Sequence, residues 1–178
     1  MEDFNFMSQD TFKEIISLYS RSLKNENHHN IHLINQDEYE DIKNSLLGEE
    51  VRDSTFRRWA RLHFCHITVG NDYIVHVLMT ERKEKAKNNI NKNVQSLPVL
   101  IVENMYKEFC LAHLDASHKK TAGTYDKLRS KWGNINRNLV KLFCERCSIC
   151  AIRVNRKFNN EIAGKAIIAK NFLSRLQV

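Results

Sequence analysis

Apolar residues recur every three or four positions in six stretches of the chain, which is the spacing of one face of an α-helix. In the first stretch these positions include Phe12, Ile15 and Tyr19. Gly48 follows the second stretch, as at the end of a helix, and Asn134 stands where it can cap the last one. The pattern therefore predicts helices at residues 9–24, 36–47, 53–60, 103–114, 122–131 and 135–146.

Between the third and fourth predicted helices the pattern changes. The stretches from Leu62 to Val69 and from Tyr73 to Met79 are rich in β-branched and aromatic residues. Gly70-Asn71-Asp72 separates them and is typical of a hairpin turn. A short apolar run from Leu97 to Val102 is placed to add a third strand. The chain is therefore expected to be mainly α-helical, with a small β-hairpin or three-stranded sheet.

The composition fits a folded protein with a modest core. The chain has 178 residues, of which 42% are hydrophobic and 28% charged, enough for one ordinary domain or two small ones. Small cores are weak, and a bound metal often reinforces them. No apolar run approaches the ~20 residues that a membrane span needs. The acidic N-terminus lacks the apolar core of a secretory signal, so the five cysteines are expected to be thiols or metal ligands.

Charge is distributed unevenly along the chain. Residues 1–118 hold 14 Lys and Arg against 18 Asp and Glu, whereas residues 119–178 hold 14 against 3. A basic block of this kind favours a polyanionic partner, most commonly nucleic acid, although a solvated basic face explains it as well. A membrane surface is a weaker interpretation, because the basic residues are spread over several predicted elements. The candidate DNA contacts are Lys119, Lys120, Lys127, Arg129, Lys131, Arg137, Lys141, Arg153, Arg156 and Lys157.

Two histidines and two cysteines have the spacing of a zinc site. His113 and His118 are separated by four residues, and Cys147 and Cys150 follow as a Cys-x2-Cys pair. Two imidazoles and two thiolates complete a tetrahedral zinc site and leave no open position, so one structural Zn²⁺ per chain is predicted. Cys144 also forms a Cys-x2-Cys pair with Cys147, so either pair can ligate; the second is favoured because Cys144 follows an apolar stripe position. A redox dithiol or simply packed thiols are the other interpretations.

The stretch from His113 to Cys150 resembles the zinc-binding domain found at the front of retroviral-type integrases. It is closest to the integrases of Gypsy-type elements and to Ginger-type transposases with their host-domesticated relatives. One departure is Lys120, where the family commonly has glycine. The residues between the His and Cys pairs that carry the resemblance are Thr124, Leu128, Trp132, Ile135, Val140 and Phe143.

The resemblance extends closely over residues 95–178 and loosely over residues 36–94, whereas residues 1–35 match nothing in the family. Together with the predicted elements, it divides the sequence into an N-terminal helical segment at 1–50, a hairpin-containing extension at 51–102 and a three-helix zinc-binding module at 103–157. Residues 158–178 would then lead toward an RNase H-like catalytic core, because the last eight residues look like the approach to its first strand. The catalytic carboxylates of such a core are expected beyond this sequence, so the chain itself is expected not to be an enzyme.

The implied function is that of a non-catalytic DNA-binding and assembly module of a nuclear integrase-like or transposase-like protein. Its expected partners are double-stranded DNA and a further copy of itself, with no membrane and no small-molecule substrate. The alternative is a domesticated module that docks or dimerises with proteins and has no DNA binding, which the acidic N-terminal part favours. A separate enzyme built on Cys65 with His63 and His66 is a third hypothesis, which a packed cysteine between two partly exposed histidines explains as well.

Overall fold

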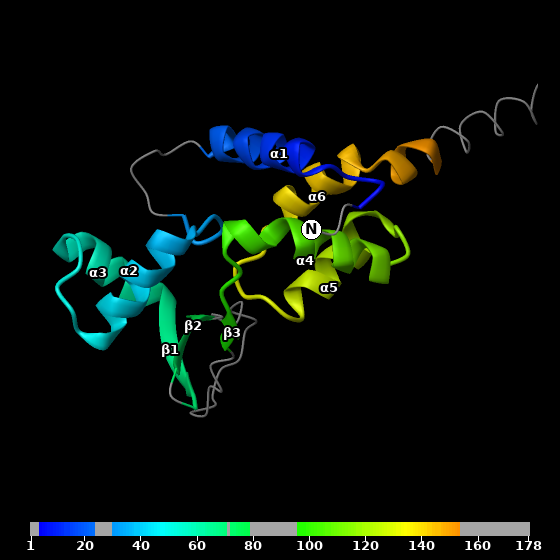
Figure 1. Cartoon of the computed structure of the whole chain (residues 1–178). Helices are drawn as coiled ribbons and strands as arrows, with labels where there is room; N and C mark the ends of the chain where they lie inside the picture. Colours follow the sequence, from blue (N-terminus) through cyan, green and yellow to red (C-terminus); the bar gives the residue numbers. More distant parts are fainter. Residues whose placement is uncertain (1–3, 24–29, 71, 79–95, 154–178) are drawn as a thin grey trace, which may run out of the picture.

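The structure, a computed structural model, describes residues 4–23, 30–70, 72–78 and 96–153 (Figure 1). It is mainly helical with one three-stranded antiparallel sheet, which confirms the predicted fold class. Among the described residues, none of the helices has the length and apolar character needed to cross a bilayer. The elements are α1 (Gln9–Ser22), α2 (Gln36–Leu47), α3 (Ser54–His63), β1 (Phe64–Val69), β2 (Asp72–Leu78), β3 (Ser96–Pro98), α4 (Val102–Asp115), α5 (Lys120–Arg129) and α6 (Arg137–Arg146).

Side-chain caps define the starts of the first three helices. The Ser8 hydroxyl accepts the backbone N–H of Thr11, and Asn35 and Asp53 act in the same way at α2 and α3. Gly48 ends α2 in the left-handed conformation at φ +96°, which a residue without Cβ adopts at little cost. The sequence therefore specifies these boundaries locally.

The helix α3 is longer than predicted, and this changes the start of the sheet. It continues to His63, so the expectation that the first strand begins at Leu62 is wrong. The strand β1 pairs with β2 from Phe64 opposite Val77, and β3 adds to the other edge of β2. His63 and Cys65 consequently do not share a strand.

Two hydrophobic clusters form the interior. The first joins α1, α4, α5 and α6 with the segment before α1, and Phe12, Phe109 and Phe143 stack edge to face within it. The second lies between α2, α3 and the sheet, around Phe56 and Val75. Figure 1 shows α1 lying along α6 above α4, whereas α2, α3 and the sheet lie to one side. The helix α1 thus belongs with the C-terminal helices and not with its neighbour α2.

Buried hydrogen bonds of Asn134 join the loop before α6 to the segment before α4. Its amide donates to Leu100 O and its Oδ1 accepts from Leu100 N, both at 2.8 Å. Its backbone carbonyl oxygen lies 2.9 Å from His32 Nδ1, in the segment before α2. The prediction that Asn134 caps the last helix is wrong, because Asn136 caps α6, which begins at Arg137. The buried Asn134 side chain instead completes the backbone pairing of Leu100.

We expect Asn134→Ala to lower the free energy of unfolding by about 2–3 kcal/mol, because it leaves both polar groups of Leu100 buried without a partner. Chemical denaturation at fixed metal concentration measures this loss. Asn138→Ala, at an exposed position on the first turn of α6, is the matched control and should change stability by less than about 0.5 kcal/mol. Equal effects of the two substitutions would contradict the role assigned to Asn134.

Candidate metal centre

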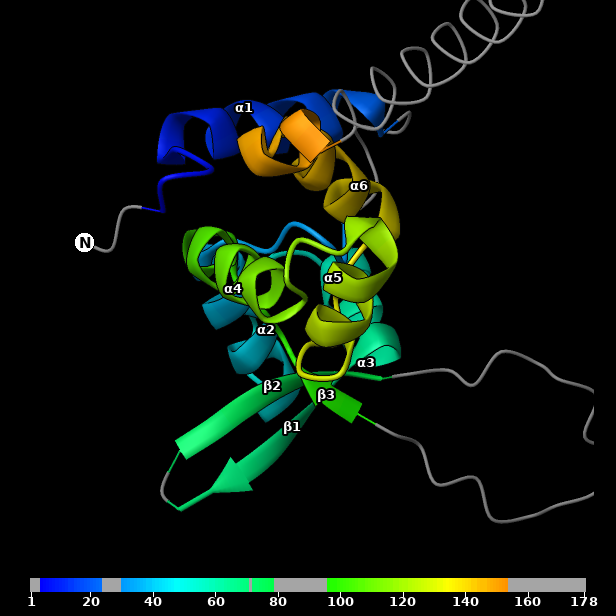
Figure 2. The ribbon, with the colours of Figure 1, turned by 90° about the vertical axis from the view of Figure 1, so that its right-hand side faces the viewer.

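Three segments of the chain bring the two histidines and two cysteines together. His113 lies in the last turn of α4, His118 lies in the loop before α5, and the two cysteines follow α6. Residues 148–153, which include Cys150, are helical. This short helical segment turns the second cysteine back toward the histidines. Figure 2 shows α4 and α5 side by side, with α6 above them.

The geometry of the four side chains fits a tetrahedral metal ion. One donor atom from each of His113, His118, Cys147 and Cys150 lies within 4.8 Å of all the others. Cys147 Sγ is 3.5 Å from His118 Nδ1, and Cys150 Sγ is 3.3 Å from His113 Nε2. In a tetrahedral zinc site a sulfur and a nitrogen ligand lie about 3.6 Å apart, given the usual Zn–S and Zn–N bond lengths. The cluster can therefore hold a metal ion.

Thr124 orients the imidazole of His113. Its Oγ1 lies 2.8 Å from His113 Nδ1 and donates onward to Lys120 O. Since His113 Nε2 faces Cys150, Nδ1 is the nitrogen left to carry the proton and donate it to the threonine. Such a hydrogen bond fixes the tautomer and the ring plane of a metal-binding histidine.

The structure distinguishes between the two possible cysteine pairs. Cys144 Sγ lies 3.8 Å from His113 Nδ1 and 3.7 Å from Thr124 Oγ1, on the side of the ring that faces away from the cluster. Cys144 is buried in the last turn of α6. The pair that joins the histidines is therefore Cys147 with Cys150.

Burial sets the charge state of the donors when no metal is bound. Burial, followed by the charges of His118 and Arg153, lowers the pKa of His113 to about 4. Its imidazole is therefore neutral at pH 7, as metal binding requires. Burial, followed by the neighbouring Cys147, raises the pKa of the Cys150 thiol to about 12. A metal ion must consequently displace a proton from this sulfur.

The loop between α4 and α5 has an unusual backbone. Ser117, His118 and Lys120 have φ values of 51°, 53° and 20°. The left-handed region costs about 1–2 kcal/mol for a residue with a Cβ. Lys120 keeps a positive φ despite its side chain. The loop thus presents His118 to the cluster in a strained conformation that other contacts must hold.

Sequence reasoning missed Phe6, which forms a wall of the cluster. Its ring centroid lies 4.9 Å from that of His118 and 5.8 Å from that of His113. Phe6 precedes α1, far from the His-Cys motif in the chain, and no spacing rule connects the two. The only signal in the sequence is the aromatic run Phe4-Asn5-Phe6 in an otherwise polar N-terminus.

The basic residues proposed as DNA contacts separate into groups. Arg129 on α5 and Arg137 on α6 both stack against the ring of Tyr125, which brings them together. Lys119 and Lys127 lie around a shallow hollow that two aspartates also line, so acidic groups accompany them. The described candidates are all exposed. Lys120, Lys131, Lys141 and Arg153 are further exposed positions, whereas Arg156 and Lys157 lie outside the described residues.

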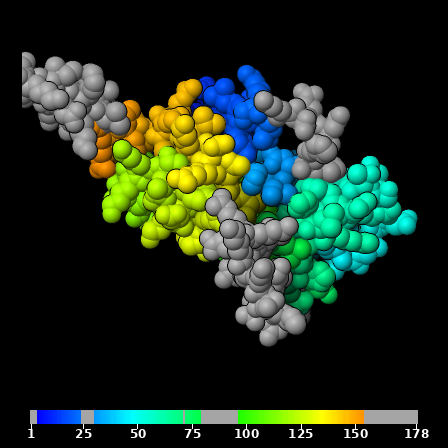
Figure 3. All heavy atoms as spheres, turned by 180° about the vertical axis from the view of Figure 1, so that it is seen from behind, coloured from blue at the N-terminus to red at the C-terminus, as the bar shows by residue number. Residues whose placement is uncertain are grey.

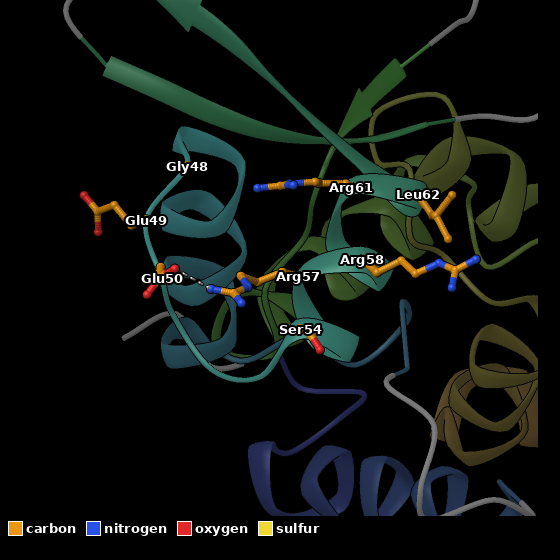
Figure 4. Close-up of a pocket in the computed structure, with 8 residues that line it drawn as sticks. All are labelled: Gly48, Glu49, Glu50, Ser54, Arg57, Arg58, Arg61 and Leu62. Carbon is orange, nitrogen blue, oxygen red and sulfur yellow. Dashed lines mark ion pairs between the residues drawn. The ribbon is translucent and has the colours of Figure 1, made fainter.

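A further group of basic residues lies on α3, which sequence reasoning assigned to the acidic part of the chain. The helix contains no acidic residue, and Arg57, Arg58 and Arg61 line a hollow beside the end of α2. Seen from behind, α3 lies on the opposite side of the molecule from α5 and α6 (Figure 3). Arg57 and Arg61 point toward the loop of Glu49 and Glu50, whereas Arg58 points to the opposite side (Figure 4). Because residues 1–118 carry more acidic than basic residues in total, their overall charge concealed the excess of arginines on α3.

The chain matches no protein-family model, no curated protein and no solved structure. Its function is therefore inferred from its own residues and their geometry.

We expect Thr124→Val to weaken metal binding about 10- to 100-fold, because valine keeps the shape of the side chain but removes the oxygen that accepts the His113 proton. Competition with a chromophoric chelator measures the affinity. Thr124→Ser keeps the hydroxyl and should bind metal nearly as tightly as the wild type. Equal affinities of the Val and Ser variants would show that the hydrogen bond does not support the site.

Proposed function

We propose that His113, His118, Cys147 and Cys150 bind one structural Zn²⁺. The convergence of their four donor atoms is the observation that carries this proposal. Two nitrogen and two sulfur donors suit zinc and fill its tetrahedral shell, which leaves no position for a substrate or an activated water. Binding of zinc to comparable sites contributes about 10–16 kcal/mol, which counts as folding free energy. The ion would tie α4, α5 and α6 into one module.

The module is proposed to bind DNA and support assembly in an integrase-like or transposase-like protein of the nucleus, without catalysis by this chain. The His-His-Cys-Cys spacing, its placement on three helices and the excess of basic residues after residue 118 support this interpretation. Arg129 and Arg137 are the leading contacts, since Tyr125 holds both guanidinium groups on one side of the module. Contacts with phosphates would give salt-dependent binding with little reading of sequence.

One observation favours the alternative, a module that binds proteins or a second copy of itself. The strand β1 forms an edge of the sheet, and Val69 at its end is 56% exposed. Leu62, at the end of α3 just before β1, is 62% exposed. Unpaired strand edges with apolar neighbours readily pair with another chain. This surface belongs to the second hydrophobic cluster and not to the zinc module. Binding of a protein here and binding of DNA by the module therefore do not exclude each other.

The purified chain should contain one zinc per molecule, and His118→Ala or Cys147→Ala should abolish metal binding and much of the helical signal. Elemental analysis and circular dichroism measure the two quantities. His66→Ala and Cys65→Ala change the same residue types outside the cluster and should keep the metal. A native chain that stays fully folded without metal in a strong chelator would overturn the proposed structural zinc.

Binding of duplex DNA should weaken steeply as salt increases, because phosphate contacts release counterions. The double variant Arg129→Ala/Arg137→Ala should reduce the slope of log K against log salt by about 0.9 for each phosphate that the two arginines neutralise. Fluorescence anisotropy over a salt series measures the slope. Arg21→Ala, on the last turn of α1, is the control and should leave the slope unchanged. No binding at low salt, combined with a dimer in light scattering, would favour the protein-interaction alternative.

A further inference from the structure

The segment before α1 packs directly against the His-Cys cluster. The ring of Phe6 meets the imidazole of His118 edge to face at 4.9 Å, with an interplanar angle of 88°. Phe6 is only 6% exposed, and Met7 beside it is 3% exposed. Phe4 packs against Phe6 at 5.8 Å between ring centroids. A short apolar segment thus covers one side of the site.

Backbone hydrogen bonds attach the same segment to the turn that carries the cysteines. Phe6 O accepts from the backbone N–H of Ser148 at 3.3 Å and from its hydroxyl at 3.4 Å. Ser148 stands between Cys147 and Cys150, so this contact reaches the Cys-x2-Cys turn itself. On the other side, the Tyr106 hydroxyl donates to Met7 O at 2.7 Å. The position of Phe6 is therefore fixed from both α4 and the cysteine turn.

The cover adjoins the more exposed half of the cluster. His113 and Cys147 are completely buried, whereas His118 and Cys150 are only partly so. Phe6 contacts His118, one of the two accessible donors, and its carbonyl anchors the turn that ends at the other. An apolar shell controls the access of solvent to a metal site, and the ring offers no polar atom that could replace a ligand. Loss of this ring would widen the path by which a chelator reaches a metal beside His118.

We propose that residues 4–7 are an integral cover of the metal centre and that Phe6 is a positioning residue for its two imidazoles. The cover slows exchange of the metal and protects Cys150 from external reagents. This proposal rests on the proposed metal site. It also means that the first helix and the metal support each other, because the segment that leads into α1 contacts the donors.

The test uses the full chain loaded with Co²⁺, whose visible absorption reports the tetrahedral sulfur and nitrogen shell. Release of Co²⁺ to excess EDTA should be at least about tenfold faster in Phe6→Ala than in the wild type, in the range found for other outer-shell residues. Phe6→Leu keeps an apolar cover and should release the metal nearly as slowly as the wild type. Phe6→Val is a milder truncation that retains a measurable effect if Phe6→Ala does not fold.

Phe12→Ala is the matched control for reduced packing. Phe12 is also a buried aromatic residue, but it stacks on Tyr106, Phe109 and Phe143 and not on an imidazole. We expect this substitution to lower the free energy of unfolding while changing the release rate far less than Phe6→Ala. Alkylation of Cys150 by iodoacetamide in the metal-loaded protein, followed by mass spectrometry, should increase in Phe6→Ala and not in Phe12→Ala.

The outcomes separate the two proposals. A wild-type chain that binds neither Zn²⁺ nor Co²⁺ overturns the metal centre itself. A chain that binds both metals but releases Co²⁺ at the same rate in the wild type and in Phe6→Ala, or in Phe6→Val if the alanine variant does not fold, overturns the cover alone. The same conclusion follows if Phe12→Ala releases the metal as fast as Phe6→Ala, since a general weakening of the packing would then explain both.

Discussion

The convergence of four donor side chains at the end of α4 is the constraint on which the C-terminal half of the fold depends. His113 and His118 lie with ring centroids 4.5 Å apart, which is tolerable only while their charges do not repel each other. Burial lowers the pKa of His113 and raises that of Cys150, so these two groups are neutral near pH 7 when no metal is bound. Buried polar groups of this kind need partners. A metal ion would satisfy all four donors at once, and it would also compensate the strained backbone at His118.

The two hydrophobic clusters are coupled through a few polar contacts and not through a shared core. The carbonyl oxygen of Asn134 lies 2.9 Å from His32 Nδ1, and Ile34 forms an isolated parallel bridge with Ile101 and accepts from the backbone N–H of Val102. Because the first cluster contains α1 as well as α4, α5 and α6, the chain crosses between clusters after α1 and again before α4. These short connections are where the two clusters meet.

Local patterns in the sequence predicted the helices, the hairpin and the four His and Cys residues that cluster, since each depends on spacing within a short stretch. Contacts between distant segments were not predictable in this way. Asn134 looked like a helix cap because residue type alone cannot distinguish a cap from a buried bridge. Phe6 gave no sign of its role, because the histidines and the cysteine turn that it contacts lie more than a hundred positions away. Choosing between Cys144 and Cys150 as the partner of Cys147 likewise required knowing which ring nitrogen of His113 faces the cluster.

The basic residues of the two hydrophobic clusters would depend on the metal to different extents. Arg129 and Arg137 belong to α5 and α6, and Tyr125 brings them together only while these helices keep their relative orientation. A metal bound at the end of α6 would fix that orientation, so this basic surface depends on the metal centre. The arginines of α3 stand on the second cluster, which Phe56 and the sheet support without the metal. Removal of the metal would therefore disturb the placement of Arg129 and Arg137 and leave the arginines of α3 in place.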